Sequence, residues 1–148
     1  MDRSGRVGTA SAATVEGMTD SAPARRSTLT WPWAAAIDAL LVLVFATIGR
    51  ASHEHSLDVL GVLETAWPFL VGLAAGWAVL RAWRAPVAPL RTGALLVVIT
   101  VVVGMLLRVV SGGTTAVAFV IVATVTLLVF LVGWRGIALL VARRRVRR

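Results

Sequence analysis

The chain has 148 residues, of which 58% are hydrophobic and only 15% are charged. Soluble domains use roughly half apolar and about a quarter charged residues, so this composition excludes an ordinary water-soluble domain. All fifteen basic residues are arginines, and the formal net charge is +8. The arginines flank apolar runs and form no patch with interleaved aromatic residues, so we expect no nucleic-acid partner. The lack of cysteine excludes disulfides and cysteine-ligated metals.

The N-terminal segment, residues 1–29, is rich in Ser, Thr, Ala and Gly and has no apolar periodicity. It contains too few apolar side chains to offset the entropy of ordering, so we predict a disordered cytoplasmic tail. A four-helix membrane domain is predicted over residues 30–142, and residues 143–148 are predicted to form an arginine-rich cytoplasmic tail.

Four apolar runs cover residues 32–49, 59–83, 92–110 and 114–134. Each has about the 17–25 residues that cross a bilayer as a helix, and each is apolar on nearly every face. Inside lipid the backbone must satisfy its own hydrogen bonds, which favours helices despite the Val and Ile content of the last two runs. We therefore predict an all-α fold, a polytopic membrane protein with a four-transmembrane-helix bundle and short loops.

Two prolines bear on where helices begin. Pro32 suits the first turn of the first helix, where a missing N–H has no consequence. Pro68 leaves two alternatives open. Either the second helix begins near Trp67, or it begins near Val59 and Pro68 kinks it, in which case the carbonyl of Glu64 lacks its helical donor.

The distribution of arginine predicts the orientation. In a four-span arrangement thirteen of the fifteen arginines lie on the side of the termini, and only Arg50 and Arg108 lie on the other side. The positive-inside rule then places both termini in the cytoplasm, in a multi-pass protein of the cell membrane. The C-terminal RRRVRR suits anionic lipid, at ~1 kcal/mol per arginine. Tryptophans at the ends of the runs match an interfacial belt: Trp31, Trp33, Trp67, Trp83 and Trp134.

Charged residues also fall inside or at the edges of the apolar runs. A charge at the bilayer centre costs ~2.5–3.5 kcal/mol, so such residues usually face a partner or a cavity. Asp38 and Arg135 both lie toward the cytoplasm. Glu64 and Arg108 both lie toward the outside, with Arg50 nearby. One hypothesis is two buried ion pairs, one in each leaflet. The alternative is that the arginines snorkel to the interfaces and the acids lie at helix ends.

The inner pair makes a simple test available. If opposite charge alone joins Asp38 to Arg135, exchanging the two residues should restore folding that is lost in the single variants.

The loop after the first run, IGRASHEHSLDV, is predicted to keep its charges in water. His53 and His55 flank Glu54, which raises a metal site or a pH sensor as one interpretation. Residues at i and i+2 share a face only in extended chain, and the sequence has no further histidine, so a solvated loop is the other.

Small residues in the second and third runs allow close helix packing. Gly72 and Gly76 form a GxxxG pair, and Gly104 lies between Thr100 and Arg108 on one face at i, i+4 spacing. These glycines serve packing within the chain or, alternatively, a face for a homo-oligomer, which such a small bundle can form.

Catalytic motifs are absent from the sequence: it has no P-loop, dinucleotide-binding fingerprint, nucleophile elbow or HExxH. We therefore expect no enzyme activity and no cofactor.

The segments DALLVLVFATIGRASH, TAWPFLVGLAAGW and VGMLLRVVSGGTTAVAFVIVA, followed by GWR, resemble a bacterial integral membrane family known as domain of unknown function 3054. The resemblance covers about residues 33–136. It implies the four-span arrangement but no activity that can be transferred. The matching positions are Asp38, Phe45, Gly49, Arg50, His53, Pro68, Phe69, Gly72, Gly104, Arg108, Phe119, Trp134 and Arg135.

Two function classes follow from these residues. The first is a small transporter or channel-like protein, in which the intramembrane charges line a polar path or bind an ion or an anionic solute. The second is a structural or accessory protein that packs with another membrane component through its small-residue faces. The hydration of Asp38 and Glu64 discriminates between these two classes. If both residues are sealed in ion pairs, the argument for a transporter is lost, and if they face a water-filled cleft, it is strengthened.

Overall fold

A computed structural model describes residues 30–51, 58–113 and 116–146. In chain order its helices are α1 (Thr30–Ala51), α2 (Val59–Val79), the 3₁₀ turn η1 (Ala82–Arg84), the π-helical turn η2 (Pro89–Ala94), α3 (Leu95–Val110) and α4 (Val117–Val146). Four helices are long and apolar enough to cross a membrane, with η2 and α3 forming one continuous span. The all-α fold is therefore confirmed, and the chain is a multi-pass membrane protein.

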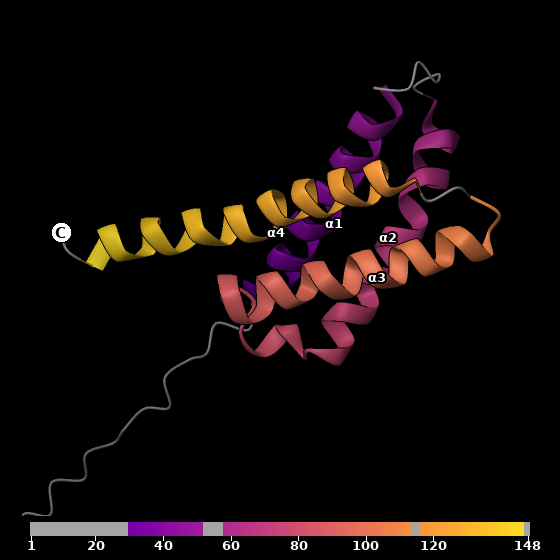
Figure 1. Cartoon of the computed structure of the whole chain (residues 1–148). Coiled ribbons are helices and arrows are strands. Elements are labelled where there is room, and N and C mark those ends of the chain that lie inside the picture. Colours follow the sequence, from indigo (N-terminus) through magenta and orange to yellow (C-terminus); the bar gives the residue numbers. More distant parts are fainter. Residues whose placement is uncertain (1–29, 52–57, 114–115, 147–148) are drawn as a thin grey trace, which may run out of the picture.

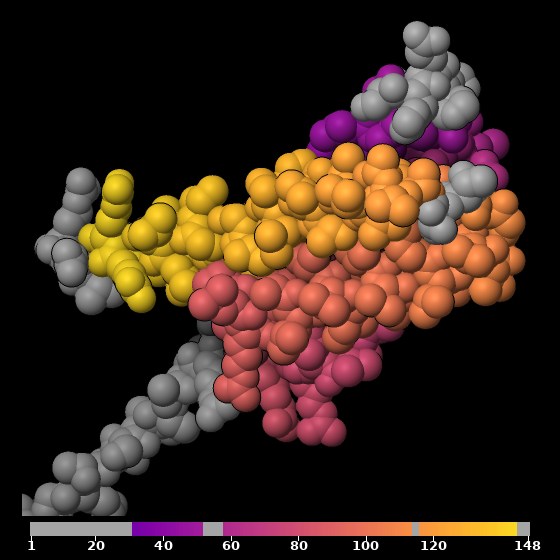
Figure 2. All heavy atoms as spheres, viewed as in Figure 1, coloured from indigo at the N-terminus to yellow at the C-terminus, as the bar shows by residue number. Residues whose placement is uncertain are grey.

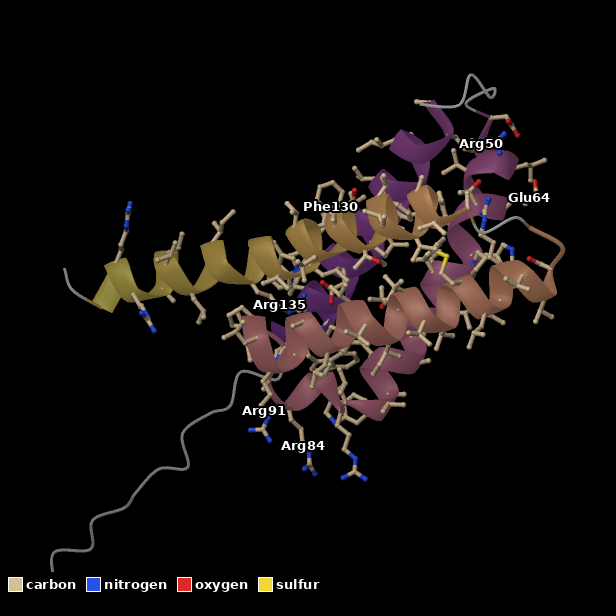
Figure 3. All side chains as sticks on the ribbon, in the orientation of Figure 1. Arg50, Glu64, Arg84, Arg91, Phe130 and Arg135 are labelled. Carbon is tan, nitrogen blue, oxygen red and sulfur yellow. The ribbon has the colours of Figure 1, made fainter. Side chains whose placement is uncertain are left out.

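The helices alternate in direction, so their connections lie at two opposite ends of the molecule (Figure 1). The α1–α2 and α3–α4 connections lie at one end, where Figure 3 labels Arg50 and Glu64. The α2–α3 connection lies at the other end, with Arg84 and Arg91. We call these the Arg50 end and the Arg91 end. The C-terminal part of α4 extends away from the other helices (Figures 1 and 2).

Proline and capping chemistry account for the first two helices. Pro32 lies in the first turn of α1. Asp58 caps α2, since its carboxylate accepts a 2.8 Å hydrogen bond from the N–H of Gly61. Pro68 lies inside α2, so the helix begins near Val59 and not near Trp67. This resolves the two alternatives that the sequence left open.

The observed helix ends differ from the predicted spans. Helix α2 stops at Val79 because Arg81 adopts a left-handed backbone (φ 48°), which ends an α-helix. The third span begins earlier than residue 92, with η2, where the N–H groups of Thr92 and Gly93 both point to the carbonyl of Ala88.

Helix α4 also departs from the prediction, because it starts at Val117 and continues to Val146, past the predicted end at residue 134. Residues 143–146, assigned from the sequence to a C-terminal tail, are therefore helical. The predicted N-terminal tail lies outside the described residues.

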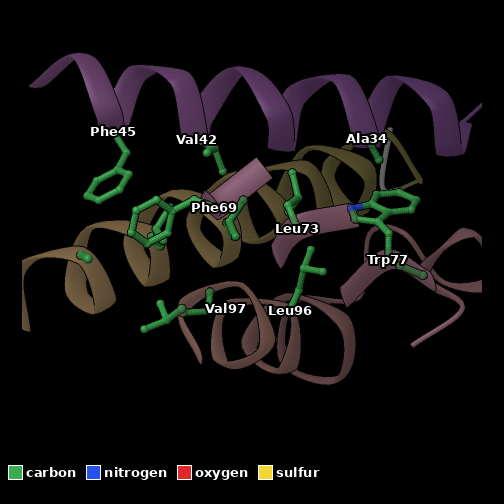
Figure 4. Close-up of a cluster of buried hydrophobic side chains, with 13 residues drawn as sticks. Ala34, Val42, Phe45, Phe69, Leu73, Trp77, Leu96 and Val97 are labelled. Atoms are coloured by element: carbon green, nitrogen blue, oxygen red, sulfur yellow. The ribbon is translucent and has the colours of Figure 1, made fainter. Parts of the chain in front are cut away.

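The core lies between the four helices and is made of apolar side chains (Figure 4). The tightest contact joins α2 to α3. A Cβ atom at Gly72 would lie 2.7 Å from the carbonyl oxygen of Thr100, and one at Gly104 would lie 2.6 Å from the ring of Phe69. At Gly76 it would meet Leu96 at 2.7 Å. All three glycines thus pack within the chain.

Candidate functional site

Asp38, in the first half of α1, is fully buried and pairs with Arg135 of α4, which is also fully buried. The two terminal nitrogens of the guanidinium donate to the two carboxylate oxygens at 2.8 and 2.7 Å. This bidentate geometry is the strongest form of an Arg–carboxylate contact. The structure thus brings together the two charges that the sequence placed at matching depth.

Two tryptophans complete the environment of this carboxylate. The indole N–H of Trp77 donates to one oxygen of Asp38 at 3.0 Å, and that of Trp134 donates to the other at 2.8 Å. The carboxylate therefore accepts four hydrogen bonds, which matches its acceptor capacity of about four lone pairs. We call Asp38, Trp77, Trp134 and Arg135 the Asp38 cluster.

Two further donors of Arg135 bind backbone carbonyls. Its Nε donates to Pro86 at 2.9 Å and one terminal nitrogen donates to Leu131 at 2.7 Å. Its guanidinium carbon also lies 4.7 Å from the ring centroid of Trp134. A Cβ atom at Gly93 would be 3.2 Å from the Arg135 side chain, so a glycine of η2 leaves room for it. With its charges and hydrogen bonds matched, this cluster is built to join helices.

The Arg50 end has a different arrangement. Arg50 pairs with Asp58 at 3.2 Å, with side chains 18% and 50% exposed, across the α1–α2 connection. Between Glu64 and Arg108, both in the described part of the chain, the structure has no ion pair. The predicted outer pair is thus wrong. Glu64 is exposed near the start of α2, whereas the guanidinium of Arg108 is held 4.7 Å from the ring centroid of Phe119.

A cleft of about 860 Å³ opens at this end, and all four long helices contribute to it. Its charged lining residues are Arg50, Glu64 and Arg108. We call it the Arg50–Arg108 cleft. Its other lining residues include Phe45 and Ile48 from α1, Trp67 and Pro68 from α2, the Ser111–Gly113 turn, and Phe119, Val122 and Thr126 from α4.

Three phenylalanines from different helices meet beside this cleft. The ring centroids of Phe45 and Phe69 lie 5.2 Å apart at an interplanar angle of 81°, an edge-to-face contact. Phe119 lies 6.4 Å from Phe45 and 6.3 Å from Phe69. Phe45 and Phe119 line the cleft, and Phe69 is fully buried behind them. This phenylalanine cluster is the part of the core that borders the cleft.

Neither Trp77 nor Trp134 was identified from the sequence as a hydrogen-bond donor to Asp38. Trp134 was assigned to the interfacial belt and to the positions shared with the family, but not to a hydrogen bond with Asp38. Trp77 had a signal, because it lies inside a predicted span and a buried indole N–H needs an acceptor. His53 and His55 fall outside the described residues. In the described ranges, no three His, Asp or Glu side chains are grouped so that they could hold a metal ion.

Comparisons with curated proteins and with solved structures found no match. A family model described as "Protein of unknown function (DUF3054)" matches residues 35–138, which contain all four spans except the ends of α1 and α4. The matched segment includes both partners of the buried ion pair and every charged residue of the cleft. Since this match covers well over half of the sequence, the chain belongs to the DUF3054 family.

Proposed function

We propose that this membrane protein binds an anionic ligand in the Arg50–Arg108 cleft. The observation that carries the proposal is the cleft itself, in which guanidinium groups from α1 and α3 line a cavity of about 860 Å³ beside an aromatic cluster. Ligand pockets have volumes of about 300–1,000 Å³, with few polar groups among apolar ones. Ionisable residues at membrane depth commonly mark a site for solutes.

The rest of the molecule supports binding at one end more than conduction through a pore. Phe45, Phe69 and Phe119 close the cleft on its core side. Closer to the Arg91 end, the Asp38 cluster joins α1 to α4 and carries two charges that satisfy each other. An ion that moved from the cleft toward the Arg91 end would first meet apolar side chains. It would then meet Asp38 and Arg135, whose charged groups already bind each other and would not coordinate the ion.

The orientation that we propose places the cleft outside the cell and both termini in the cytoplasm. The Arg91 end carries exposed arginines from the α2–α3 connection, Arg81, Arg84 and Arg91, and α4 adds Arg143 and Arg144. An excess of arginine favours the cytoplasmic side of the membrane. The same arginines suit anionic lipid headgroups of that leaflet.

A carrier is the second candidate, and the one-sided cleft favours it. Carriers alternate between states in which a central site is open to one side and closed to the other. A cleft at the Arg50 end with an ion pair toward the Arg91 end matches one such state. If the protein binds the ligand but does not transport it across the membrane, the structural or accessory function is the alternative. We propose no catalytic role.

Anion-dependent thermal unfolding of the purified protein tests the binding proposal. Phosphate, sulfate and benzoate would each be added at constant ionic strength to the wild type, to Arg108→Gln and to the control Arg91→Gln. A ligand at 100 times its Kd stabilises by about 2.7 kcal/mol. We expect at least one anion to raise the Tm of the wild type and of the control but not of Arg108→Gln. Equal responses in all three proteins would refute the site.

Reconstitution separates the carrier from the accessory protein. Liposomes containing the wild type or Asp38→Asn would be loaded with the anion that stabilises best, and its efflux would be compared with that from empty liposomes. Efflux above the empty-liposome rate identifies a carrier. Efflux equal to that rate, for an anion that does bind, identifies a binding or accessory protein.

A further inference from the structure

The Arg50–Arg108 cleft has two chemically different parts. Its mouth carries the guanidinium groups, Glu64 and the Ser111–Gly113 turn. Its deeper wall is apolar and comes mainly from α1 and α4. Ile48 and Val122 line this wall and are 50% and 58% exposed. A charged mouth above an apolar wall has the polarity of an amphiphile.

We propose that the ligand is a single-chain anionic amphiphile of the fatty-acid class. Its carboxylate would lie at Arg108, and its alkyl chain would follow α4 toward Thr126. This inference rests on the proposed function, because it names the chemical class of the anion that the cleft binds.

The head of such a ligand fits the placement of Arg108. Its guanidinium carbon lies 4.7 Å from the ring centroid of Phe119, so the guanidinium contacts an aromatic ring at the cleft wall. A guanidinium stacks through its flat face and binds carboxylates through its in-plane N–H groups, so the two contacts are compatible. Arg50 lines the same mouth, and its ion pair with Asp58 fixes its position.

The tail fits the depth of the cleft. Thr126 lines it nine residues after Val117, the first residue of α4, which corresponds to roughly 13 Å along the helix axis. A small anion at the mouth would contact only the charged groups and leave this apolar wall uncovered. An alkyl chain would cover it. One continuous cavity of about 860 Å³, with a phenylalanine cluster along its core side, favours one chain over two.

Photolabelling with a fatty acid that carries a diazirine at mid-chain tests this inference. The full-length protein in detergent would be irradiated, and the adducts would be mapped by mass spectrometry. We expect adducts at Val122 and Thr126 that excess unlabelled fatty acid suppresses. Loss of a charge-assisted contact weakens binding by about tenfold or more, so Arg108→Gln should lose most of the labelling. The control Arg91→Gln should keep it.

A second pair of variants separates the chain from the head. Val122→Trp fills the apolar wall and leaves every charged residue of the mouth in place. Ile121→Trp places the same bulk one residue away, at a position that is 58% exposed and does not line the cleft. We expect Val122→Trp to lose the photolabelling while its Tm still rises with the small anion that stabilises the wild type. Ile121→Trp should keep both properties.

The outcomes are distinguishable. If a small anion stabilises the protein through Arg108 but the photoreactive acid labels lipid-facing residues without saturation, the amphiphile is excluded and the anion site remains. If neither the small anions nor the fatty acid depends on Arg108, both proposals fail. Equal photolabelling of Val122→Trp and Ile121→Trp would also overturn the placement of the chain.

Discussion

The two ends of this molecule surround an arginine side chain with different groups. Arg135 is fully buried, and each of its three nitrogens donates to Asp38 or to a backbone carbonyl. Arg108 lies in the last turn of α3, where it lines an open cleft and contacts an aromatic ring, whereas Arg135 lies well inside α4, which continues to Val146. The surroundings of the two arginines therefore differ along with their positions in the helices.

The two sites also differ in the acidic residues and carbonyl groups that the structure describes at each. Around Arg135, Asp38 and the carbonyls of Pro86 and Leu131 supply acceptors from three parts of the chain. At the Arg50 end the one described acidic residue in an ion pair, Asp58, serves Arg50 and caps α2. The Asp38 cluster joins α1 to α4 through these contacts, whereas Arg108 lines the cleft in which we propose that an anion binds.

The largest expected effect comes from removing each arginine in turn. Arg135→Ala leaves a buried carboxylate without its counter-charge and should destabilise the fold by about 3–5 kcal/mol. Arg108→Ala removes a cation–π contact and should destabilise it by only about 0.5–1 kcal/mol. Unfolding free energies in mixed micelles measure both. Equal losses would erase the distinction between the two ends.

Exchanging the partners of the Asp38 cluster sharpens the comparison. Asp38→Arg combined with Arg135→Asp restores opposite charges, but it points the N–H groups of Trp77 and Trp134 at a cation and an aspartate at carbonyl oxygens. A buried donor without an acceptor costs about 1–3 kcal/mol. We therefore expect the double variant to stay at least about 2 kcal/mol below the wild type. Full rescue would show that charge alone holds the site, as the sequence suggested.

A substitution at Gly72 should loosen the contact between α2 and α3, which lies between the two ends. In Gly72→Ala, the new Cβ would lie 2.7 Å from the backbone oxygen of Thr100, so α2 and α3 must move apart. Overpacking of this kind costs about 1–3 kcal/mol. Gly133→Ala is the matched control, because nothing lies within 4 Å of its Cβ position. Thermal unfolding of the two variants should differ in that direction, and identical Tm values would argue against the close approach.

The smallest effect should come from substituting Thr100. Its effect on stability indicates whether water from the cleft reaches this part of the core. Its hydroxyl is buried and, alone among the described buried side-chain polar atoms, has no hydrogen-bond partner. Thr100→Val keeps the shape and removes this group, so stability should rise by up to about 1 kcal/mol. In the control Thr47→Val, a hydroxyl that donates to Leu43 at 2.9 Å is lost. A stability loss in Thr100→Val would indicate that water from the cleft reaches this layer.

Most of the fold could be predicted because lipid imposes few alternatives. Length and hydropathy suffice to find four spans, and the backbone must then be helical. The ends of the helices were less predictable. The end of α2 depends on a left-handed Arg81, and α4 continues to Val146 because nothing in GIALLVARRRV breaks a helix. Whether Pro68 starts α2 or lies within it depends on the Asp58 cap.

Only the site residues that carry a charge inside or beside an apolar run could be predicted from the sequence. Asp38 and Arg135 stood out because isolated charges are rare in such runs. The carbonyl of Pro86 and the indoles of Trp77 and Trp134 carried no comparable signal, since hydrogen-bond partners depend on how the helices rotate against each other. At the other end the same reasoning paired Glu64 with Arg108. It failed because the phenylalanine cluster, which positions Arg108, arises only from tertiary packing.

The pairing of the first helix with the last has a consequence for synthesis. Asp38 leaves the ribosome 97 residues ahead of Arg135. At about 5–20 residues per second, its carboxylate waits roughly 5–20 s before the guanidinium of its partner is synthesised. A nascent chain that stalls before α4 therefore keeps an acidic residue that no later helix neutralises.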